Sequence, residues 1–177
     1  MAKFFDKLSE NLKDFITEQK MFFTATAPDE GRINLSPKGN DSLRILDEKT
    51  VAYLDLTGSG NESSAHIHQN GRMTFMFCSF VGNPLILRLY GQGEVVKKSS
   101  ERWQELEVHF PHYSGERQII VLHIDSVQTS CGYGVPVYEF QEERTRLMVW
   151  TKPEPIEDYW ALKNQTSIDG LPTHILS

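Results

Sequence analysis

The sequence predicts a mainly β fold, with six or seven antiparallel strands that close into a barrel and with flanking helices. Short apolar runs recur along the chain and turn residues separate them. No βαβ unit is evident, so antiparallel connections are expected. Closing such a sheet into a barrel removes exposed edges. The 177 residues are enough for one domain with a buried core.

The chain starts with helical periodicity and then changes to strand composition. Apolar residues recur at helical spacing over residues 3–20, which predicts an amphipathic N-terminal helix with one docking face. Residues 21–27 have strand composition, and a Pro-Asp-Glu-Gly turn at 28–31 leads into an alternating strand over 32–36. These two strands are expected to form a hairpin.

The central part of the chain contains the longest apolar runs. Strands are predicted over 51–56, 72–80, 85–96 and 118–124, with a turn at 47–50 and a helix over 99–110. Gly91 and Gly93 interrupt one of these runs, which indicates a bulge or the close approach of another backbone.

The tail over residues 132–177 differs in composition. A turn-rich break at 131–136 precedes a short helix predicted over 154–164. The tail is rich in aromatic residues, among them Trp150, Tyr159 and Trp160, but it is too short for a core of its own. It is expected to pack across the barrel or onto a second subunit.

Charge and cysteine content exclude several classes of protein. The net charge of −6 argues against non-specific binding to nucleic acid or to anionic membranes, whereas a phosphorylated small molecule needs only a few local cations. The two cysteines suggest neither a disulfide scaffold nor a zinc site, and Cys78 is interpreted as a core residue. Without a membrane-length apolar stretch or a signal-peptide pattern, a cytoplasmic location is expected.

The loop over residues 57–67 is the most informative segment. It is rich in glycine, serine and threonine, follows a predicted strand and leads into a short helix. Such a loop can surround an anionic ligand with backbone N–H groups and uncharged hydroxyl donors. It lacks the Gly-Lys-Ser/Thr of a P-loop and the third glycine of a dinucleotide fingerprint. On its own it is equally compatible with a solvated connection between strands.

Several segments together resemble the pyridoxamine 5′-phosphate oxidase-related flavoproteins. The resemblance covers about residues 22–96 and extends more loosely to Cys131–Pro136 and Ser167–Pro172. The segments that carry it are Gly31-Arg32-Ile33-Asn34-Leu35-Ser36-Pro37-Lys38-Gly39, Tyr53-Leu54-Asp55-Leu56-Thr57-Gly58-Ser59-Gly60-Asn61, Ser64-Ala65-His66-Ile67 and Asn70-Gly71-Arg72-Met73-Thr74-Phe75-Met76-Phe77.

The resemblance implies a split barrel, the FMN-binding split barrel, that forms a homodimer with FMN in a cleft at the subunit interface. It also implies an oxidoreductase that acts on an unknown small molecule. The strand over residues 33–38 would run along the flavin, and the loop over residues 55–64 would hold its phosphate. The cofactor-binding residues that it implies are Asn34, Ser36, Lys38, Asp55, Thr57, Gly60, Asn61, Ser63, Ser64 and Arg88.

The sequence also departs from the family pattern. Ser63 and Ser64 stand where well-known members have a basic pair, which leaves Lys38, Arg72 and Arg88 as substitute cations for the phosphate. The C-terminal Arg-x-His segment of the vitamin B6 oxidase is absent, and no catalytic acid, base or metal site is identified. A non-catalytic flavin- or tetrapyrrole-binding module, or an oligomeric scaffold with an empty cleft, remains an alternative.

Overall fold

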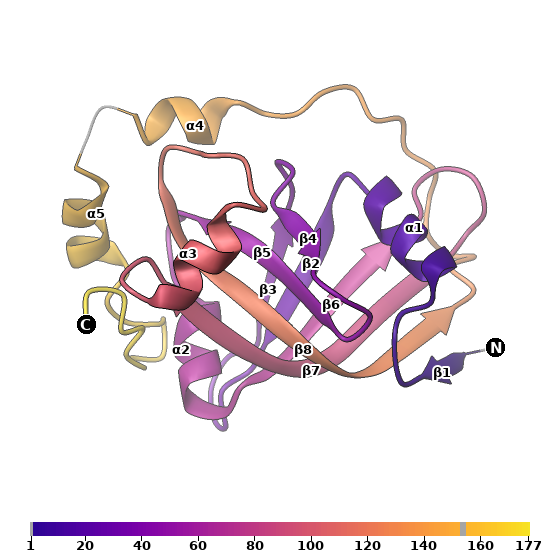
Figure 1. Ribbon diagram of the computed structural model, residues 1–177, viewed down its shortest axis with the longest axis horizontal. Coiled ribbons are helices and arrows are strands. Elements are labelled where there is room, and N and C mark those ends of the chain that lie inside the picture. The colour runs from indigo at the N-terminus through magenta and orange to yellow at the C-terminus, as the bar shows by residue number, and fades with distance from the viewer. Residues whose placement is uncertain (1, 153–154) are drawn as a thin grey trace.

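One antiparallel sheet curls into a half-barrel and forms the framework of the protein (Figure 1). The computed structural model describes residues 2–152 and 155–177. Seven strands follow the order β3-β2-β6-β7-β8-β5-β4, and β1 pairs with β8 beyond this path. The predicted split barrel is confirmed. The elements are β1 (Lys3–Phe5), α1 (Glu10–Glu18), β2 (Phe22–Thr26), β3 (Asn34–Lys38), β4 (Leu43–Ile45), β5 (Thr50–Leu56), α2 (Glu62–Asn70), β6 (Arg72–Cys78), β7 (Ile86–Lys97), α3 (Glu101–Glu107), β8 (Glu116–Ser130), α4 (Arg146–Trp150) and α5 (Ile156–Lys163).

The predicted hairpin of β2 and β3 is confirmed, with Thr24 opposite Ser36. Its turn places Gly31 at a φ of 121°, a conformation that residues with a Cβ rarely adopt. Within the described residues β3 pairs with β2 alone, so its outer edge has unpaired backbone groups. This edge borders the cleft described below.

Two hydrophobic clusters hold the sheet, one on each face. Inside the barrel the rings of Phe22, Tyr53 and Phe75 pack at centroid distances of 5.5–5.8 Å, and α1 covers them with Ile16. On the opposite face α3 packs Trp103 against strands β5, β7 and β8. Strands β5 and β8 are therefore buried on both faces, which explains their nearly continuous apolar sequence.

The N-terminal prediction was wrong in its first part. Lys3–Phe5 forms β1 instead of helix, and it pairs with Val127–Thr129 of β8. Helix α1 begins only at Glu10, after Ser9 at the N-cap position. The long strand β8 extends beyond its partner β5 and offers a free edge, and pairing with it satisfies the backbone of residues 3–5.

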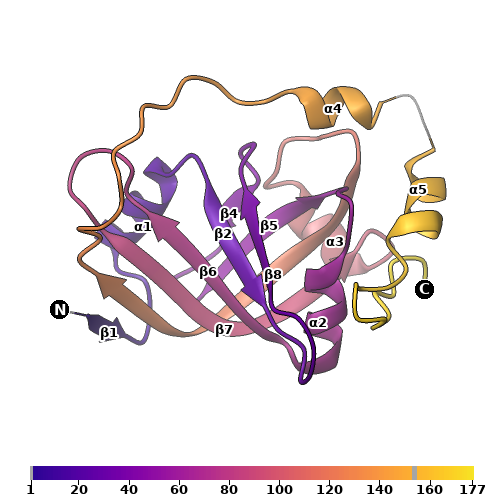
Figure 2. The same ribbon diagram turned by 180° about the vertical axis from the view of Figure 1, so that it is seen from behind.

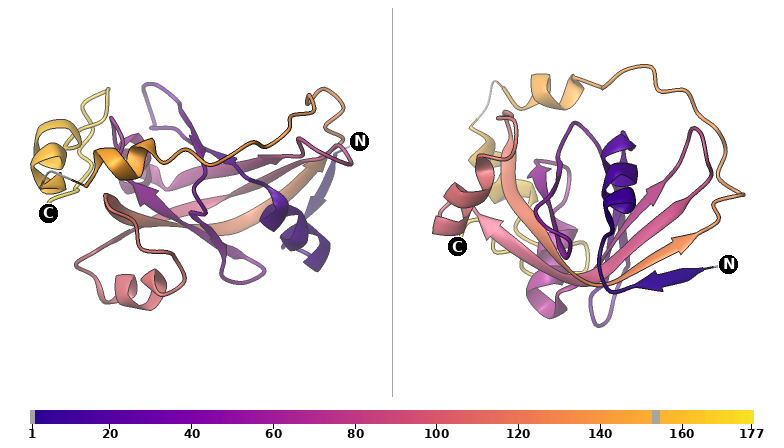
Figure 3. Two further views of the ribbon diagram at one scale, coloured as in Figure 1. Left: turned by 90° about the horizontal axis from the view of Figure 1, so that it is seen from above. Right: turned by 45° about the vertical axis from the view of Figure 1, so that its right-hand side comes forward.

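The tail leaves the end of β8, and residues 131–145 arch along one side of the barrel before α4 and α5 (Figures 1 and 2). The predicted helix in the tail is confirmed as α5, although its predicted first residue, Glu154, lies outside the described residues. The C-terminus lies beside α5 at the opposite end of the molecule from the N-terminus (Figure 3). Trp160 is buried in its own chain. No helix in the described part of the chain could span a membrane.

The expected bulge lies where the register of β7 on β8 shifts, between Tyr90 and Gly91. A Cβ on Gly91 would overlap the backbone carbonyl of His123, which cannot move without breaking the sheet. We predict that Gly91→Ala lowers the free energy of unfolding by about 1–3 kcal/mol. Gly134→Ala is the control, because a Cβ there meets nothing within 4 Å. Urea denaturation measures both variants, and equal stabilities would contradict the close approach.

Candidate functional site

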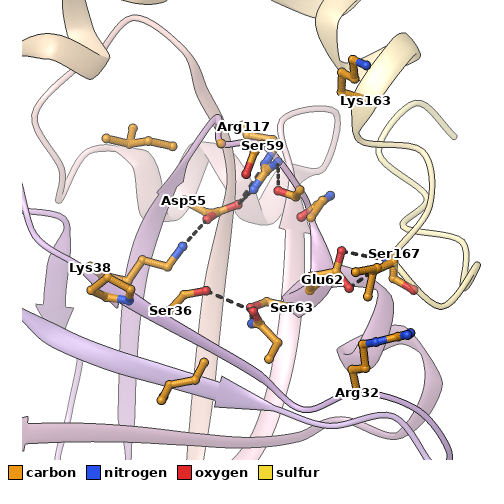
Figure 4. A pocket seen from close by; sticks show the side chains of 18 of the residues that line it. Arg32, Ser36, Lys38, Asp55, Ser59, Glu62, Ser63, Arg117, Lys163 and Ser167 are labelled. Atoms are coloured by element: carbon orange, nitrogen blue, oxygen red, sulfur yellow. Dashed lines mark hydrogen bonds and ion pairs between the residues drawn. The ribbon is translucent and has the colours of Figure 1, made fainter.

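A cleft of about 770 Å³ opens between the free edge of β3 and the loop that joins β5 to α2 (Figure 4). Its lining is mainly polar, and the C-terminal tail forms part of its wall. The lining residues are Arg32–Lys38, Asp55, Leu56, Gly58–Ser63, Arg117, Lys163 and Thr166–Ile168.

Strand β3 directs alternate side chains toward the cleft, because side chains alternate along a strand. Asn34 donates from Nδ2 to Oγ of Ser63 at 3.1 Å, and Ser36 donates from Oγ to Oδ1 of Asn34 at 3.1 Å. Lys38 donates from Nζ to Oδ1 of Asp55 at 3.1 Å (Figure 4). The period of the strand therefore brings these three residues to the β5–α2 loop.

Beneath the cleft lies a buried ion pair between Asp55 of β5 and Arg117 of β8. Their side chains are 3% and 4% exposed. Arg117 donates from Nε and Nη2 to Oδ2 of Asp55 at 3.0 and 2.8 Å, and Gln118 donates to the same oxygen at 2.9 Å. A buried carboxylate needs such partners, since an unpaired charge is costly to remove from water.

The charges of this cluster fix its protonation. Burial alone would raise the pKa of Asp55, but Arg117 and Lys38 beside it lower the pKa to about 2. Burial also favours the neutral amine of Lys38, yet the Tyr53 oxygen and the Asp55 carboxylate raise its pKa. At neutral pH one carboxylate is therefore shared by two cations, and the cluster has a net positive charge.

The same cluster shapes the loop. Arg117 donates from Nη1 to the carbonyl oxygen of Gly60 at 3.0 Å, and Gln118 donates to Oδ1 of Asn61 at 2.8 Å. Asn61 is 2% exposed, and its Nδ2 has no hydrogen-bond partner among the described residues. Because Asn61 lines the cleft, a ligand acceptor could satisfy this buried donor.

The structure brings most of the predicted cofactor-binding residues together. Asn34, Ser36, Lys38, Asp55, Gly60, Asn61 and Ser63 all line the cleft. The other three residues do not line it, and they are Thr57, Ser64 and Arg88.

Hydrogen bonds within the protein explain the positions of Thr57 and Ser64, and the alternation of side chains along β7 explains that of Arg88. Thr57 donates to the carbonyl oxygen of Gly115 at 2.7 Å, and Ser64 donates to that of Thr173 at 2.8 Å. Both hydroxyls are thus used within the protein. Arg88 alternates with buried Leu87 and Leu89, which places it on the outer face of the sheet.

Glu62, the first residue of α2, uses its carboxylate within the protein. A loop that binds an anion should turn this carboxylate to solvent, but the N–H of Ile168 donates to both of its oxygens at 3.1 Å. Glu62 therefore holds the C-terminal tail against the first turn of α2.

Sequence reasoning missed Arg117 and the tail residues of the cleft wall. One signal pointed to Arg117: Asp55 interrupts an apolar strand and requires a buried cation, and Arg117 directly precedes the apolar run over 118–124. No comparable signal marks Lys163, Ser167 or Ile168, because tertiary contacts alone bring them to the cleft.

Comparisons with known proteins agree with this architecture. The family model described as pyridoxamine 5′-phosphate oxidase matches residues 8–131. The pyridoxamine 5′-phosphate oxidase family protein ustO of Aspergillus flavus is 37% identical, over 97% of this chain and 78% of the relative.

Solved structures share the fold at lower identity. HupZ of Group A Streptococcus has a TM-score of 0.54 and 21% identity, over 68% of this chain and 91% of that one. The FAD binding protein of Mycobacterium smegmatis has a TM-score of 0.50 and 12% identity, over 71% of this chain and 97% of that one.

The ion pair predicts a specific dependence of stability on pH. The folded-state pKa of Asp55 lies below its unfolded value of 3.8, so its stabilisation is complete above about pH 4 and is lost as the pH falls toward 2. The shift corresponds to about 2 kcal/mol. Asp55→Asn should destabilise the protein by about 3–5 kcal/mol at pH 7, because the buried Arg117 and the partly buried Lys38 lose their charged partner.

Urea denaturation at pH 7, 4 and 3 measures this effect, with the exposed Asp6→Asn as the control. The gap between wild type and Asp55→Asn should narrow at pH 3. A gap that stays constant would contradict the lowered pKa.

Proposed function

The chain belongs to the pyridoxamine 5′-phosphate oxidase family, and on that premise we propose that it is an oxidoreductase that binds FMN in the cleft and acts on a small molecule. One observation carries the proposal. Asn61 keeps a buried amide donor without a partner among the described residues, beside the hydroxyl of Ser63 and the first turn of α2. A phosphate oxygen is the kind of acceptor that such a group of donors fits.

The size and charge of the cleft suit this ligand. Its volume of about 770 Å³ lies within the roughly 300–1,000 Å³ of cofactor sites. Four basic side chains line it, against the acidic Asp55 and Glu62, although the whole chain has a net charge of −6. The cleft is thus a positive region on an acidic protein and favours an anionic ligand.

The two sides of the cleft suggest how the ligand lies. The free edge of β3 offers backbone N–H and C=O groups to the polar atoms of a flavin ring, while the loop over Gly58–Ser63 offers donors to a phosphate. The FAD binding protein of Mycobacterium smegmatis shares the fold, which supports a flavin as the class of cofactor.

A bound flavin supplies the transfer of a hydride or an electron pair. The chain itself positions the flavin and supplies charge: Asp55 holds Lys38, which stays protonated in the cleft at neutral pH. Reduction of the bound flavin by NADH or NADPH, followed by reoxidation, distinguishes an enzyme from a non-catalytic flavin-binding module.

We further propose a homodimer with the cleft at the subunit interface. Ile33 and Leu35, next to and within the edge strand, are 76% and 64% exposed. Val137 and Tyr138, in the segment that arches along the barrel, are 78% and 61% exposed. Burial of these apolar side chains against a second subunit would remove their surface from water and so favour association. In such a dimer Arg88, on the outer face of the sheet, is available to the cleft of the other subunit.

Asn61→Asp tests the phosphate end of the cleft, because it keeps the acceptor for Gln118 but replaces the unpaired donor by a carboxylate. We expect FMN affinity to fall by about tenfold to a hundredfold, and riboflavin affinity to fall much less. Quenching of flavin fluorescence measures both, with exposed Asn83→Asp as the control. If wild-type protein bound neither flavin, the proposed function would be wrong.

Light scattering at micromolar concentration should give twice the chain mass of 20.3 kDa. Leu35→Glu places a charge on the exposed apolar edge, so we expect it to shift the protein toward monomer and to weaken FMN binding together. Glu30→Gln, in the exposed hairpin turn, is the control. A monomeric wild-type protein would contradict the interface.

A further inference from the structure

The C-terminal tail completes the cleft opposite β3. Lys163 at the end of α5 and residues 166–168 line the cavity from this side (Figure 4). These residues are more than a hundred positions away from the β5–α2 loop in the sequence. The tail is therefore part of the site.

A buried clamp fixes the tail to the loop. Trp160 donates from Nε1 to Oγ1 of Thr57 at 2.8 Å, and Asn164 donates from Nδ2 to the carbonyl oxygen of Gly58 at 3.2 Å. Arg117 donates from Nη1 to Oδ1 of Asn164 at 2.8 Å. Because Trp160 and Asn164 are 6% and 0% exposed, the backbone of Lys163 between them is held over the loop.

A second set of contacts holds the tail on the other side of the loop. Arg32 forms an ion pair with Asp169, and the backbone N–H of Arg32 donates to the same carboxylate at 2.7 Å. Ser64 and Glu62 bind backbone groups of Thr173 and Ile168. The tail thus contacts both the residue that leads into β3 and the first turn of α2, on the two sides of the cleft.

The basic side chains of the cleft differ in whether they already form ion pairs or hydrogen bonds within the protein. Arg32 is paired with Asp169, Lys38 with Asp55, and Arg117 makes four hydrogen bonds within the protein. Lys163 is exposed, and its side chain forms no hydrogen bond or ion pair with another described residue. Among the described lining residues it is the cation that remains for a ligand.

We propose that Lys163 binds the phosphate of the ligand and takes the place of the basic pair that is absent at Ser63 and Ser64. This inference rests on the proposed function and adds the source of the countercharge, which comes from the tail instead of the loop. A phosphate dianion prefers a charged donor to hydroxyls alone. A lysine on the rim, adjacent in sequence to a residue bound to Gly58, supplies one.

Equilibrium titration of the full chain with FMN and with riboflavin tests the inference. Lys163→Ala should weaken FMN binding by about tenfold or more and leave riboflavin binding unchanged, because riboflavin has no phosphate. Lys163→Arg should restore FMN affinity. Lys49→Ala removes another exposed lysine, in the β4–β5 turn, and should change neither affinity.

The outcomes separate the two proposals. A wild-type protein that prefers FMN, with the same preference in Lys163→Ala, would overturn the role of Lys163 and leave the flavin site intact. Equal wild-type affinity for the two flavins would also overturn it, since the site would then lack a phosphate contact. A wild-type protein that binds neither flavin would overturn both proposals. Thermal denaturation of Lys163→Ala should match wild type, because the side chain is exposed.

Discussion

The buried ion pair between Asp55 and Arg117 is the interaction on which the rest of the site depends. It joins the end of β5 to the start of β8, and through Gly60 and Asn164 it also joins the loop to the C-terminal tail. Two charges withdrawn from water stabilise a protein only when their remaining donors and acceptors are satisfied. Gln118 and Lys38 donate to Asp55, and the loop carbonyl of Gly60 accepts from Arg117. The positions of β5, β8, the β5–α2 loop and the C-terminal tail therefore depend on one another.

The ion pairs of Asp55 determine how the cleft can bind an anion. Because Lys38 and Arg117 both pair with Asp55, they hold the loop in place and contribute a positive electrostatic potential in the cleft. Direct contacts then fall to neutral donors such as Asn61 and Ser63 and to a cation from the tail. A site of this kind depends on the tail, whereas a basic pair within the loop would not require it.

The fold could be predicted from the sequence because its signals are local. Apolar runs, the turn at 28–31 and the glycine at position 91 each mark their own element, and each prediction was confirmed. Residues 3–5 were predicted wrongly, since their strand exists only because β8 offers a free edge. The helical periodicity of residues 3–20 does not reveal a partner strand more than a hundred positions away.

The same limit applies to the site. The resemblance to a family located β3 and the loop, and seven of the ten residues line the cleft. Ser64 has a hydroxyl donor suited to an anion and Glu62 has a carboxylate that would repel one, yet both side chains hold the tail. Their roles could not be predicted, because the docking of residues 164–173 decides them and nothing in the loop sequence records it.

A crystal structure of the protein soaked with FMN would show directly whether the loop and the C-terminal tail hold the phosphate together. We expect the phosphate to lie within hydrogen-bond distance of Nδ2 of Asn61 and of the amine of Lys163, with the ring along β3 and the Asp55–Arg117 pair unchanged. A flavin bound elsewhere, or a phosphate that draws Arg117 away from Asp55, would contradict it.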